Sequence, residues 1–356
     1  MASLGLCAVA CAVASLRAAA LTLPQHEPEP LSLAQASPEH PIGDPRPADL
    51  ARWSSGPLTV EASTLHHAEV RSLVGGYNLS IAAFDRWADS MVSAELLAGN
   101  GWETRRVSEL CRLYREGGAV GNFLDVGANI GTFTIPLADC LSGSGRVLAV
   151  EGMPPTADHL VAGILESKLK NVDVYTYAVG APEDPKRVVM SLNPVNKGGS
   201  AVQGTKPFTN MTDDQLQHLF HPGKKEQKYA KKVVVEEFSV QLTTGDHMLW
   251  HNPGMKAIAI AKVDIEGYEG RFIRGAQQLF SKYPPCFMTI ELIPEWLERA
   301  GTPVQEILDQ LTRWDYKNVP TLDELRRPTT DSKTRTVEQR DMAKCMQRVR
   351  SYASQQ

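Results

Sequence analysis

The sequence predicts an α/β fold in which parallel strands alternate with crossover helices. An apolar run at 123–126 breaks into small, turn-prone residues and is followed by apolar residues at helical spacing. The same alternation of strand and helix continues over 146–179. A third observation is the nearly all-apolar run 257–265, which has the composition of a strand buried on both faces.

Periodicity and turn residues give the remaining elements. Residues 107–114 carry apolar side chains at helical spacing, which predicts an amphipathic helix ahead of the first strand. A C-terminal helix is expected to carry Val337, Ala343, Met346 and Val349. The other expected elements are helices at 133–138, 156–169, 269–280 and 302–314, and strands at 172–179, 187–192, 233–240, 286–293 and 316–319.

Composition limits the classes of partner and site. The 356 residues carry a formal net charge of −4, which gives no electrostatic case for binding nucleic acid. The six cysteines form no C-x-x-C pair and no Cys/His cluster at metal-ligand spacing. We therefore expect neither a nucleic-acid partner nor a metal site.

The first 57 residues differ in composition from the rest. Residues 1–23 form a hydrophobic leader whose apolar core has the length of a signal-peptide core, and Arg17 interrupts it too early for a confident membrane span. The leader is a cleaved secretory signal, a signal anchor, an organelle transit segment or an alanine-rich disordered tail. Residues 24–57 are rich in proline and polar residues and predict a disordered linker.

Localisation depends on this leader. A functional leader would direct the chain to the secretory pathway or an organelle, and without one the chain would be cytoplasmic. Association with a membrane is expected only through an uncleaved leader. Two N-glycosylation sequons, at Asn78 and Asn210, are compatible with a lumenal protein.

The loop at 127–131 has the character of a nucleotide pocket. Glycine has no Cβ, so the backbone at Gly127 and Gly131 can turn sharply and approach a ligand. A dinucleotide fingerprint would need glycine where this chain has Asn129 and Thr132, and the chain contains no G-x-x-x-x-G-K-[ST] phosphate loop. The pocket therefore suits a ribose that carries no pyrophosphate.

Two acids add to this pocket. Glu151 follows the second strand, about twenty residues past Gly131, where a carboxylate can accept hydrogen bonds from two ribose hydroxyls. Asp125, at the end of the first strand, would face the positive ammonium or sulfonium end of a cofactor, which a phosphate ligand would not tolerate. These features favour S-adenosylmethionine (SAM) over NAD.

Three motifs, in this order, resemble the FkbM-type family of SAM-dependent methyltransferases. They are Phe-Leu-Asp-Val-Gly-Ala-Asn-Ile-Gly-Thr-Phe-Thr at 123–134, Val-Glu-Gly-x-Pro at 150–154 and Lys-Val-Asp-Ile-Glu-Gly-Tyr-Glu at 262–269. The similarity extends from Val107 to Val319. One departure is Gly152, where the family more often has proline, and the acid before it is kept.

The resemblance implies a Rossmann-like class I methyltransferase fold, with a mostly parallel sheet of about seven strands, an antiparallel edge at 316–319 and flanking helices. It implies a methyltransferase domain at 121–320, after an N-terminal helical extension at 58–120 and before a basic C-terminal tail with a helix at 321–356. Ala178 would line the adenine pocket, with plain core packing as the alternative. The cofactor would be SAM, and its expected ligands are Asp125, Gly127, Ala128, Asn129, Gly131, Glu151, Ala178 and Asp264.

The acids that follow the apolar strand are the candidate catalytic residues. Asp264 and Glu266 are two residues apart, so on a continuing strand they would point to the same side at the carboxyl edge of the sheet. There they could orient an acceptor hydroxyl or accept its proton. Capping of the next helix is the alternative, which we favour for Glu269. Glu291, at the end of the following strand, could contact substrate or pair with a cation.

A long insertion at 193–232 separates two added strands. It could form a lid that brings Ser200, His218 or His221 near the reacting group, and the two histidines are further candidates for a general base. The alternative, which we favour, is a solvated surface elaboration.

FkbM-type relatives mostly methylate hydroxyls. The resemblance therefore implies an O-methyltransferase for a sugar or a small natural product, with a small-molecule or glycan acceptor. The acceptor and the oligomeric state are left open by the sequence. Two alternatives are a non-catalytic SAM-binding protein of the same fold and an NAD-dependent dehydrogenase, which the missing glycines disfavour.

Overall fold

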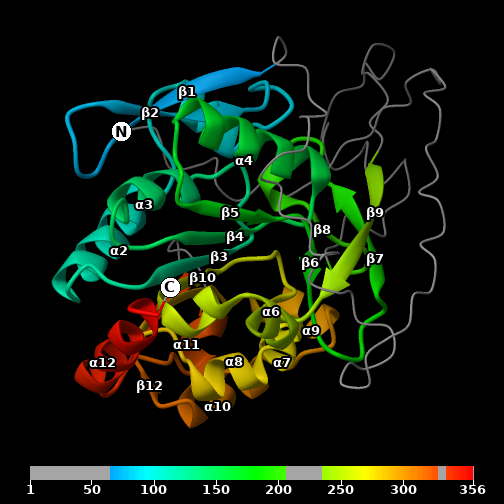
Figure 1. The fold of residues 1–356 in the computed structure, drawn as a ribbon. Coiled ribbons are helices and arrows are strands. Elements are labelled where there is room, and N and C mark those ends of the chain that lie inside the picture. Colours follow the sequence, from blue (N-terminus) through cyan, green and yellow to red (C-terminus); the bar gives the residue numbers. More distant parts are fainter. Residues whose placement is uncertain (1–64, 206–234, 328–333, 356) are drawn as a thin grey trace, which may run out of the picture.

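A seven-stranded sheet forms the centre of the computed structural model, which describes residues 65–205, 235–327 and 334–355. Its strand order is β12-β13-β11-β10-β3-β4-β5 (Figure 1). The pairs β11–β10, β10–β3, β3–β4 and β4–β5 are parallel, and β13 runs antiparallel to both of its neighbours. These strands are β3 (Asn122–Val126), β4 (Val147–Val150), β5 (Val172–Tyr175), β10 (Ile258–Val263), β11 (Phe287–Glu291), β12 (Tyr316–Lys317) and β13 (Thr334–Gln339). The predicted α/β fold with a mostly parallel sheet is confirmed.

Helices cover both faces of this sheet because successive strand residues alternate between two apolar cores. In β3, Phe123 belongs to the core on one face and Leu124 to the core on the other. The first core takes side chains from α2 (Thr104–Glu116), α3 (Thr134–Cys140), α4 (Pro154–Glu166) and α12 (Met342–Ala353). The second takes side chains from α6 (Gly245–His251), α7 (Glu269–Gly275), α8 (Gln277–Lys282), α9 (Pro294–Arg299), α10 (Val304–Arg313) and α11 (Leu322–Arg326).

The sequence predicted a helical extension before the central sheet, but this segment is only partly helical. It begins with an antiparallel hairpin of β1 (His66–Arg71) and β2 (Asn78–Ala83), followed by α1 (Val92–Leu97) and then α2. The hairpin packs on α4, along the upper edge of the molecule in Figure 1. Burial of Leu79 and Ile81 against this helix holds the strand in place, and such a tertiary contact has no local sequence signal.

A second, four-stranded sheet stands beside the carboxyl ends of the central strands (Figure 1). Its strands, in spatial order, are β6 (Ala178–Val179), β9 (Glu236–Thr243), β7 (Arg187–Leu192) and β8 (Ala201–Val202). The single strand expected at 172–179 is therefore wrong: β5 ends at Tyr175, and the chain crosses to pair β6 with β9. The expected strand at 233–240 begins three residues later, as β9.

The C-terminal segment corrects one further expectation and confirms another. Val337 lies on β13, in the middle of the sheet's antiparallel part, and not in the C-terminal helix. The antiparallel edge strand expected at 316–319 is confirmed as β12, which is shorter than expected and pairs with β13. Every residue of β13 except Val337 is polar, and the Thr289 and Thr336 hydroxyls lie 3.0 Å apart across its ladder with β11. Because this composition lacks the apolar pattern of a buried strand, the sequence did not predict β13.

None of the described helices is long and apolar enough for a membrane crossing.

Two disulfides join elements that are distant in sequence. Cys111 of α2 is bonded to Cys140 of α3, and Cys286, just before β11, is bonded to Cys345 of α12. All four side chains are buried. The bonds thus attach the helix before β3 and the last helix of the chain to the same apolar core.

We expect each disulfide to stabilise the fold by restricting the unfolded chain. Replacing Cys111 and Cys140 together by alanine should lower the free energy of unfolding by about 3–4 kcal/mol, measured by urea unfolding of the oxidised protein. The second bond spans 59 residues against 29, so alanine at Cys286 and Cys345 should cost about 0.6 kcal/mol more. Each double variant retains the other disulfide, so reductant should still destabilise it, but by less than it destabilises the unaltered protein. Equal stability of a double variant and the unaltered protein would contradict the prediction.

Candidate active site

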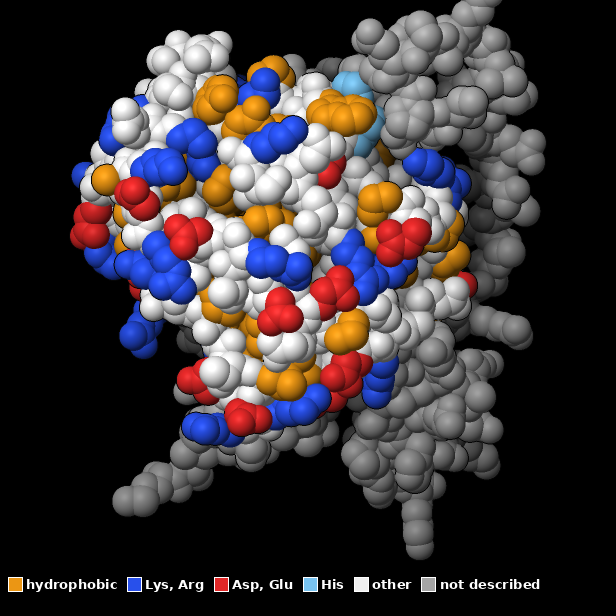
Figure 2. Space-filling view, turned by 90° about the horizontal axis from the view of Figure 1, so that it is seen from below, with side chains coloured by type: hydrophobic (Ala, Val, Ile, Leu, Met, Phe, Trp, Pro, Cys, Tyr) orange, Lys and Arg blue, Asp and Glu red, His pale blue; other side chains and the backbone are white. Residues whose placement is uncertain are grey.

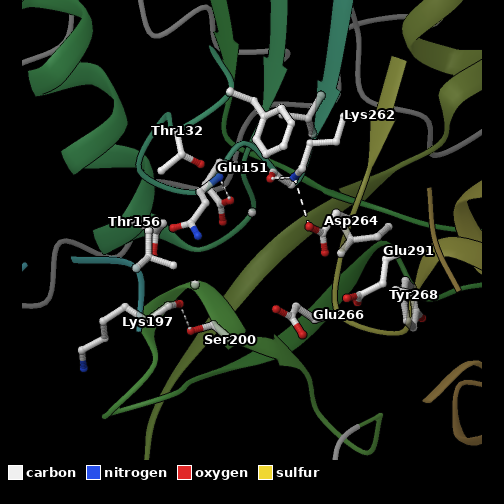
Figure 3. Close-up of a pocket in the computed structure, with 18 of the residues that line it drawn as sticks. Thr132, Glu151, Thr156, Lys197, Ser200, Lys262, Asp264, Glu266, Tyr268 and Glu291 are labelled. Atoms are coloured by element: carbon white, nitrogen blue, oxygen red, sulfur yellow. Dashed lines mark hydrogen bonds and ion pairs between the residues drawn. The ribbon is translucent and has the colours of Figure 1, made fainter. Parts of the chain in front are cut away.

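A cavity of about 500 Å³ lies where β3, β4, β10 and β11 end. This is the edge at which open α/β sheets bind ligands, and the volume is in the range of small-molecule sites. The second sheet closes the cavity from the side, with Ala178, Met190 and Val202 in its wall. Figure 3 shows Glu151 and Thr156 on one side of this space and Asp264, Glu266 and Glu291 on the other.

The loop after β3 takes its shape from residues with positive φ. Gly127 has φ +81°, and a Cβ there would lie 1.8 Å from the carbonyl oxygen of Asp264, so only glycine allows the two loops to touch. Asn129 has φ +53° and lines the cavity together with Gly127. Ala128 and Gly131, also expected as cofactor ligands, lie in the loop but not in the cavity wall.

Glu151 is held at the cavity wall by backbone donors. Its two carboxylate oxygens accept hydrogen bonds from the amides of Asn129, at 2.9 Å, and Met153, at 2.8 Å. Burial raises the pKa of Glu151 to about 7, although both amides act in the opposite direction. Each oxygen keeps a second lone pair, so the carboxylate could also accept hydrogen bonds from two ribose hydroxyls.

The rest of this half of the cavity fits the adenosine part of SAM. Thr156 is 2% exposed and lines the cavity, and its hydroxyl has no hydrogen-bond partner among the described residues. A ligand hydroxyl or ring nitrogen would satisfy it. Val150, Ala178 and Val179 add an apolar surface suited to the face of an adenine ring. A carboxylate, an unsatisfied hydroxyl and an apolar wall form the donor and acceptor set that a nucleoside needs.

Asp125 lies beneath the cavity and not in its wall, which differs from the expected contact with the cofactor's positive end. The side chain is fully buried and accepts a hydrogen bond from the Thr134 hydroxyl at 2.6 Å. Burial raises the pKa of the Asp125 carboxyl, and Lys262 and Thr134 lower it. Within the described structure, Asp125 instead balances the positive charge of Lys262, whose ammonium lies 3.7 Å away.

Lys262 is the site residue that sequence reasoning missed. Its ammonium donates a hydrogen bond to the carbonyl oxygen of Gly127 at 2.7 Å and lies 3.5 Å from Asp264 (Figure 3). It also lies 5.3 Å from the centre of the Phe133 ring. Burial lowers the pKa of Lys262, but the surrounding carboxylates prevail and the net shift is upward. The available signal was a single cation within the apolar strand β10, because a buried lysine requires anionic partners.

The acids beyond β10 reach the cavity by a turn and not by a continuing strand. β10 ends at Val263, and both Asp264 and Glu266 line the cavity. Glu266 has φ +61° and Gly267 φ +100°, so the alternation expected for an extended strand does not apply. Glu291, the last residue of β11, lines the same side.

Glu269 is buried next to these acids. We had favoured capping of α7 by Glu269, but the structure shows no side-chain capping hydrogen bond at the start of this helix. The Glu269 carboxylate instead accepts hydrogen bonds from the amides of Ile265, at 2.7 Å, and Gly267, at 3.3 Å. Burial, with the nearby charge of Asp264, raises the pKa of Glu269 to about 8. Oxygens of Asp264, Glu269 and Glu291 lie within 4.8 Å of one another, but a cluster of acids alone does not establish a metal site.

The described start of the insertion forms part of the cavity wall. Asn196, Lys197 and Ser200 line it, and the Ser200 hydroxyl donates a hydrogen bond to the Lys197 carbonyl at 2.7 Å. Burial lowers the pKa of the Lys197 ammonium. His218 and His221, the further candidates for a general base, lie outside the described residues.

We predict that SAM affinity depends on the ionisation of Glu151. Its pKa of about 7 means that the carboxyl is mostly protonated at lower pH and ionised at higher pH. The ionised form accepts hydrogen bonds better, so affinity measured by calorimetry should rise up to about tenfold between about pH 6 and about pH 8. Glu151→Gln should bind more weakly and lose this rise. A wild-type rise that persists in Glu151→Gln would assign the titration to the ligand or to another group.

We also predict that Lys262 is essential to the stability of the site. Lys262→Met removes the ammonium and leaves the buried Asp125 without its cation, so the free energy of unfolding should fall by about 3–5 kcal/mol in urea. Adding Asp125→Asn should recover part of this loss, because the remaining buried charge is then removed. Lys282→Met, at an exposed lysine, is the control and should have little effect. A loss no larger than that of the control would contradict the prediction.

Comparisons with solved structures and curated proteins give only distant likenesses. The M. jannaschii protein TYW2 in complex with AdoMet is 12% identical, with a TM-score of 0.31, over 77% of this chain and 83% of that one. A T. thermophilus 16S rRNA methyltransferase, RsmC, in complex with AdoMet and guanosine, is 13% identical, with a TM-score of 0.31, over 78% of this chain and 51% of that one. No curated protein matched.

The family comparison is decisive. The family model described as the methyltransferase FkbM domain matches residues 125–317, which is more than half of the chain. The match spans the loop after β3, Glu151 and the acids that follow β10. The chain therefore belongs to the FkbM methyltransferase family and is a SAM-dependent methyltransferase.

Proposed function

We propose that this methyltransferase modifies a hydroxyl group of a neutral, hydroxyl-rich acceptor, either a sugar or a small natural product. The observation that carries the proposal is the ring of carboxylates on the acceptor side of the cavity. Asp264, Glu266 and Glu291 all line it there, opposite Glu151 and Thr156 (Figure 3). Carboxylates accept hydrogen bonds from hydroxyl groups, and sugars offer several such donors.

Charge makes an anionic acceptor unfavourable at this position. A phosphate would have to enter beside three carboxylates, at a cost that low local dielectric increases. Ser200, Tyr268 and Thr334 add neutral polar side chains to the cavity wall. The nearest described cation to the acids, Lys262, is already paired with Asp125 and Asp264, and Lys197 also lines the cavity. The face of the molecule in Figure 2 mixes basic and acidic side chains, and its described part has no extended basic area of the kind that binds nucleic acid.

Asp264 is the residue we assign to proton transfer. SAM, when bound, supplies an activated methyl group. Asp264 would accept the proton of the acceptor hydroxyl and orient its oxygen, while Lys262, 3.5 Å from the carboxylate, keeps the acid in place. Val150 and Val179 give the cofactor half an apolar wall, which would limit the access of water to the methyl group when SAM is bound.

We predict that Asp264→Asn separates turnover from cofactor binding. The amide keeps the size of the side chain but cannot take up a proton, so turnover should fall by about 10²–10⁴-fold while SAM affinity changes little. Calorimetry and a methyl-transfer assay measure the two quantities. Asp309→Asn, at an exposed acid of α10, is the control. A large loss of SAM affinity would make Asp264 a cofactor ligand, and full turnover would remove its proposed role.

The acceptor class is tested with radiolabelled SAM and parallel panels of neutral sugars, sugar phosphates and RNA oligonucleotides. Methyl incorporation into neutral, hydroxyl-rich compounds supports the proposal, and preferential incorporation into phosphates or RNA overturns it. SAM binding without transfer to any panel, in a protein whose Glu151→Gln variant binds more weakly, would favour the alternative of a non-catalytic SAM-binding protein.

A further inference from the structure

The cysteines of this chain divide into two groups. Two of the six, Cys7 and Cys11, lie in the hydrophobic leader, outside the described residues. The other four all form disulfides, between α2 and α3 and between the start of β11 and α12. No cysteine after the leader therefore remains as a free thiol. Disulfides form and persist in oxidising compartments and are rare in the cytosol, so this pattern points to folding in such a compartment.

The hairpin in front of the central sheet presents one of the two glycosylation sequons. Asn78 is the first residue of β2 and pairs with Arg71, the last residue of β1, so it lies at the turn end of the hairpin. Its side chain is exposed and donates a hydrogen bond to the exposed carboxylate of Glu69 at 2.6 Å. The middle residue of the sequon, Leu79, is 3% exposed and packs in the core.

Strand geometry places the Asn78 amide, which would accept the glycan, on the face of the strand opposite this core. Successive side chains of a strand point to opposite faces, so Asn78 and Ser80 share the face that Leu79 turns away from. The Ser80 hydroxyl lies 3.0 Å from Nδ1 of His67 on that outer face. A glycan on Asn78 would thus extend into solvent without displacing a buried side chain. Neither Asn78 nor Ser80 is among the residues that line the cavity of the candidate active site.

We propose that Asn78 carries an N-linked glycan and that the chain folds in the oxidising lumen of the secretory pathway. In this modification the Asn78 amide nitrogen forms a bond to the anomeric carbon of a lipid-linked oligosaccharide. The bond from that carbon to the pyrophosphate oxygen breaks, and the amide loses one proton. No oxidant takes part in that step, whereas each disulfide is formed by exchange with an oxidised thiol carrier, which is reduced. The inference goes beyond methyl transfer and does not depend on it.

The test uses the full chain, expressed in eukaryotic cells. Electrophoretic mobility is compared before and after treatment with an N-glycan-specific amidase. The wild-type protein should shift on treatment; Asn78→Gln and Ser80→Ala should lose the shift due to this site, and Ser80→Thr, which preserves the sequon, should retain it. Asn210→Gln removes the other sequon and is the matched control, in which the Asn78 shift persists.

Thiol state provides the second measurement on the same samples. A mass-tagged maleimide, applied before and after reduction to protein quenched in acid, should label the four cysteines after the leader only once the disulfides are reduced. Absence of any shift in wild type, or a shift in Asn78→Gln and Ser80→Ala equal to that of wild type, overturns the site. Four cysteines that react without reduction overturn the lumenal assignment. Methyl-transfer activity enters neither measurement, so this proposal and the proposed function can fail separately.

Discussion

The buried ammonium of Lys262 is the interaction on which both halves of the site depend. It donates to the carbonyl oxygen of Gly127 and lies between the carboxylates of Asp125 and Asp264. The loop after β3, which shapes the cofactor half, is thereby connected to the turn after β10, which supplies the acceptor half. Since the three charged groups are buried or half-buried, the electrostatic energy of each depends on the presence of the others.

The two halves are built in different ways. The cofactor half comes mainly from one continuous strand–loop–helix unit and from Glu151, which is bound by an amide of that same loop. The acceptor half brings together residues from distant parts of the chain: Ser200 follows β7, Glu291 ends β11, and Thr334 begins β13 opposite it. Family membership identifies the cofactor, whereas the acceptor depends on side chains that the fold alone does not specify and is therefore proposed.

The two disulfides and the β1–β2 hairpin bear on the cellular compartment proposed for this enzyme. The bonded cysteines attach α2 and α12 to the first core, next to the sheet that carries the site. In an oxidising lumen these bonds would be kept without a reducing pool to break them. A lumenal enzyme would also require delivery of SAM across a membrane, because a charged cofactor does not cross a lipid bilayer unaided.

Local patterns in the sequence determined the fold class, the loop at Gly127, Glu151 and the acids after β10, because each depends on residues that are close in the chain. Only the tertiary structure decided which segments pair: the β1–β2 hairpin, the departure of β6 to the second sheet, the insertion of β13 and the partners of the cysteines. It also placed Asp125 beneath the cavity and Lys262 in its wall. The physical reason is that strand pairing and buried charge are satisfied by partners far away in sequence, and periodicity within a single segment carries no information about those partners.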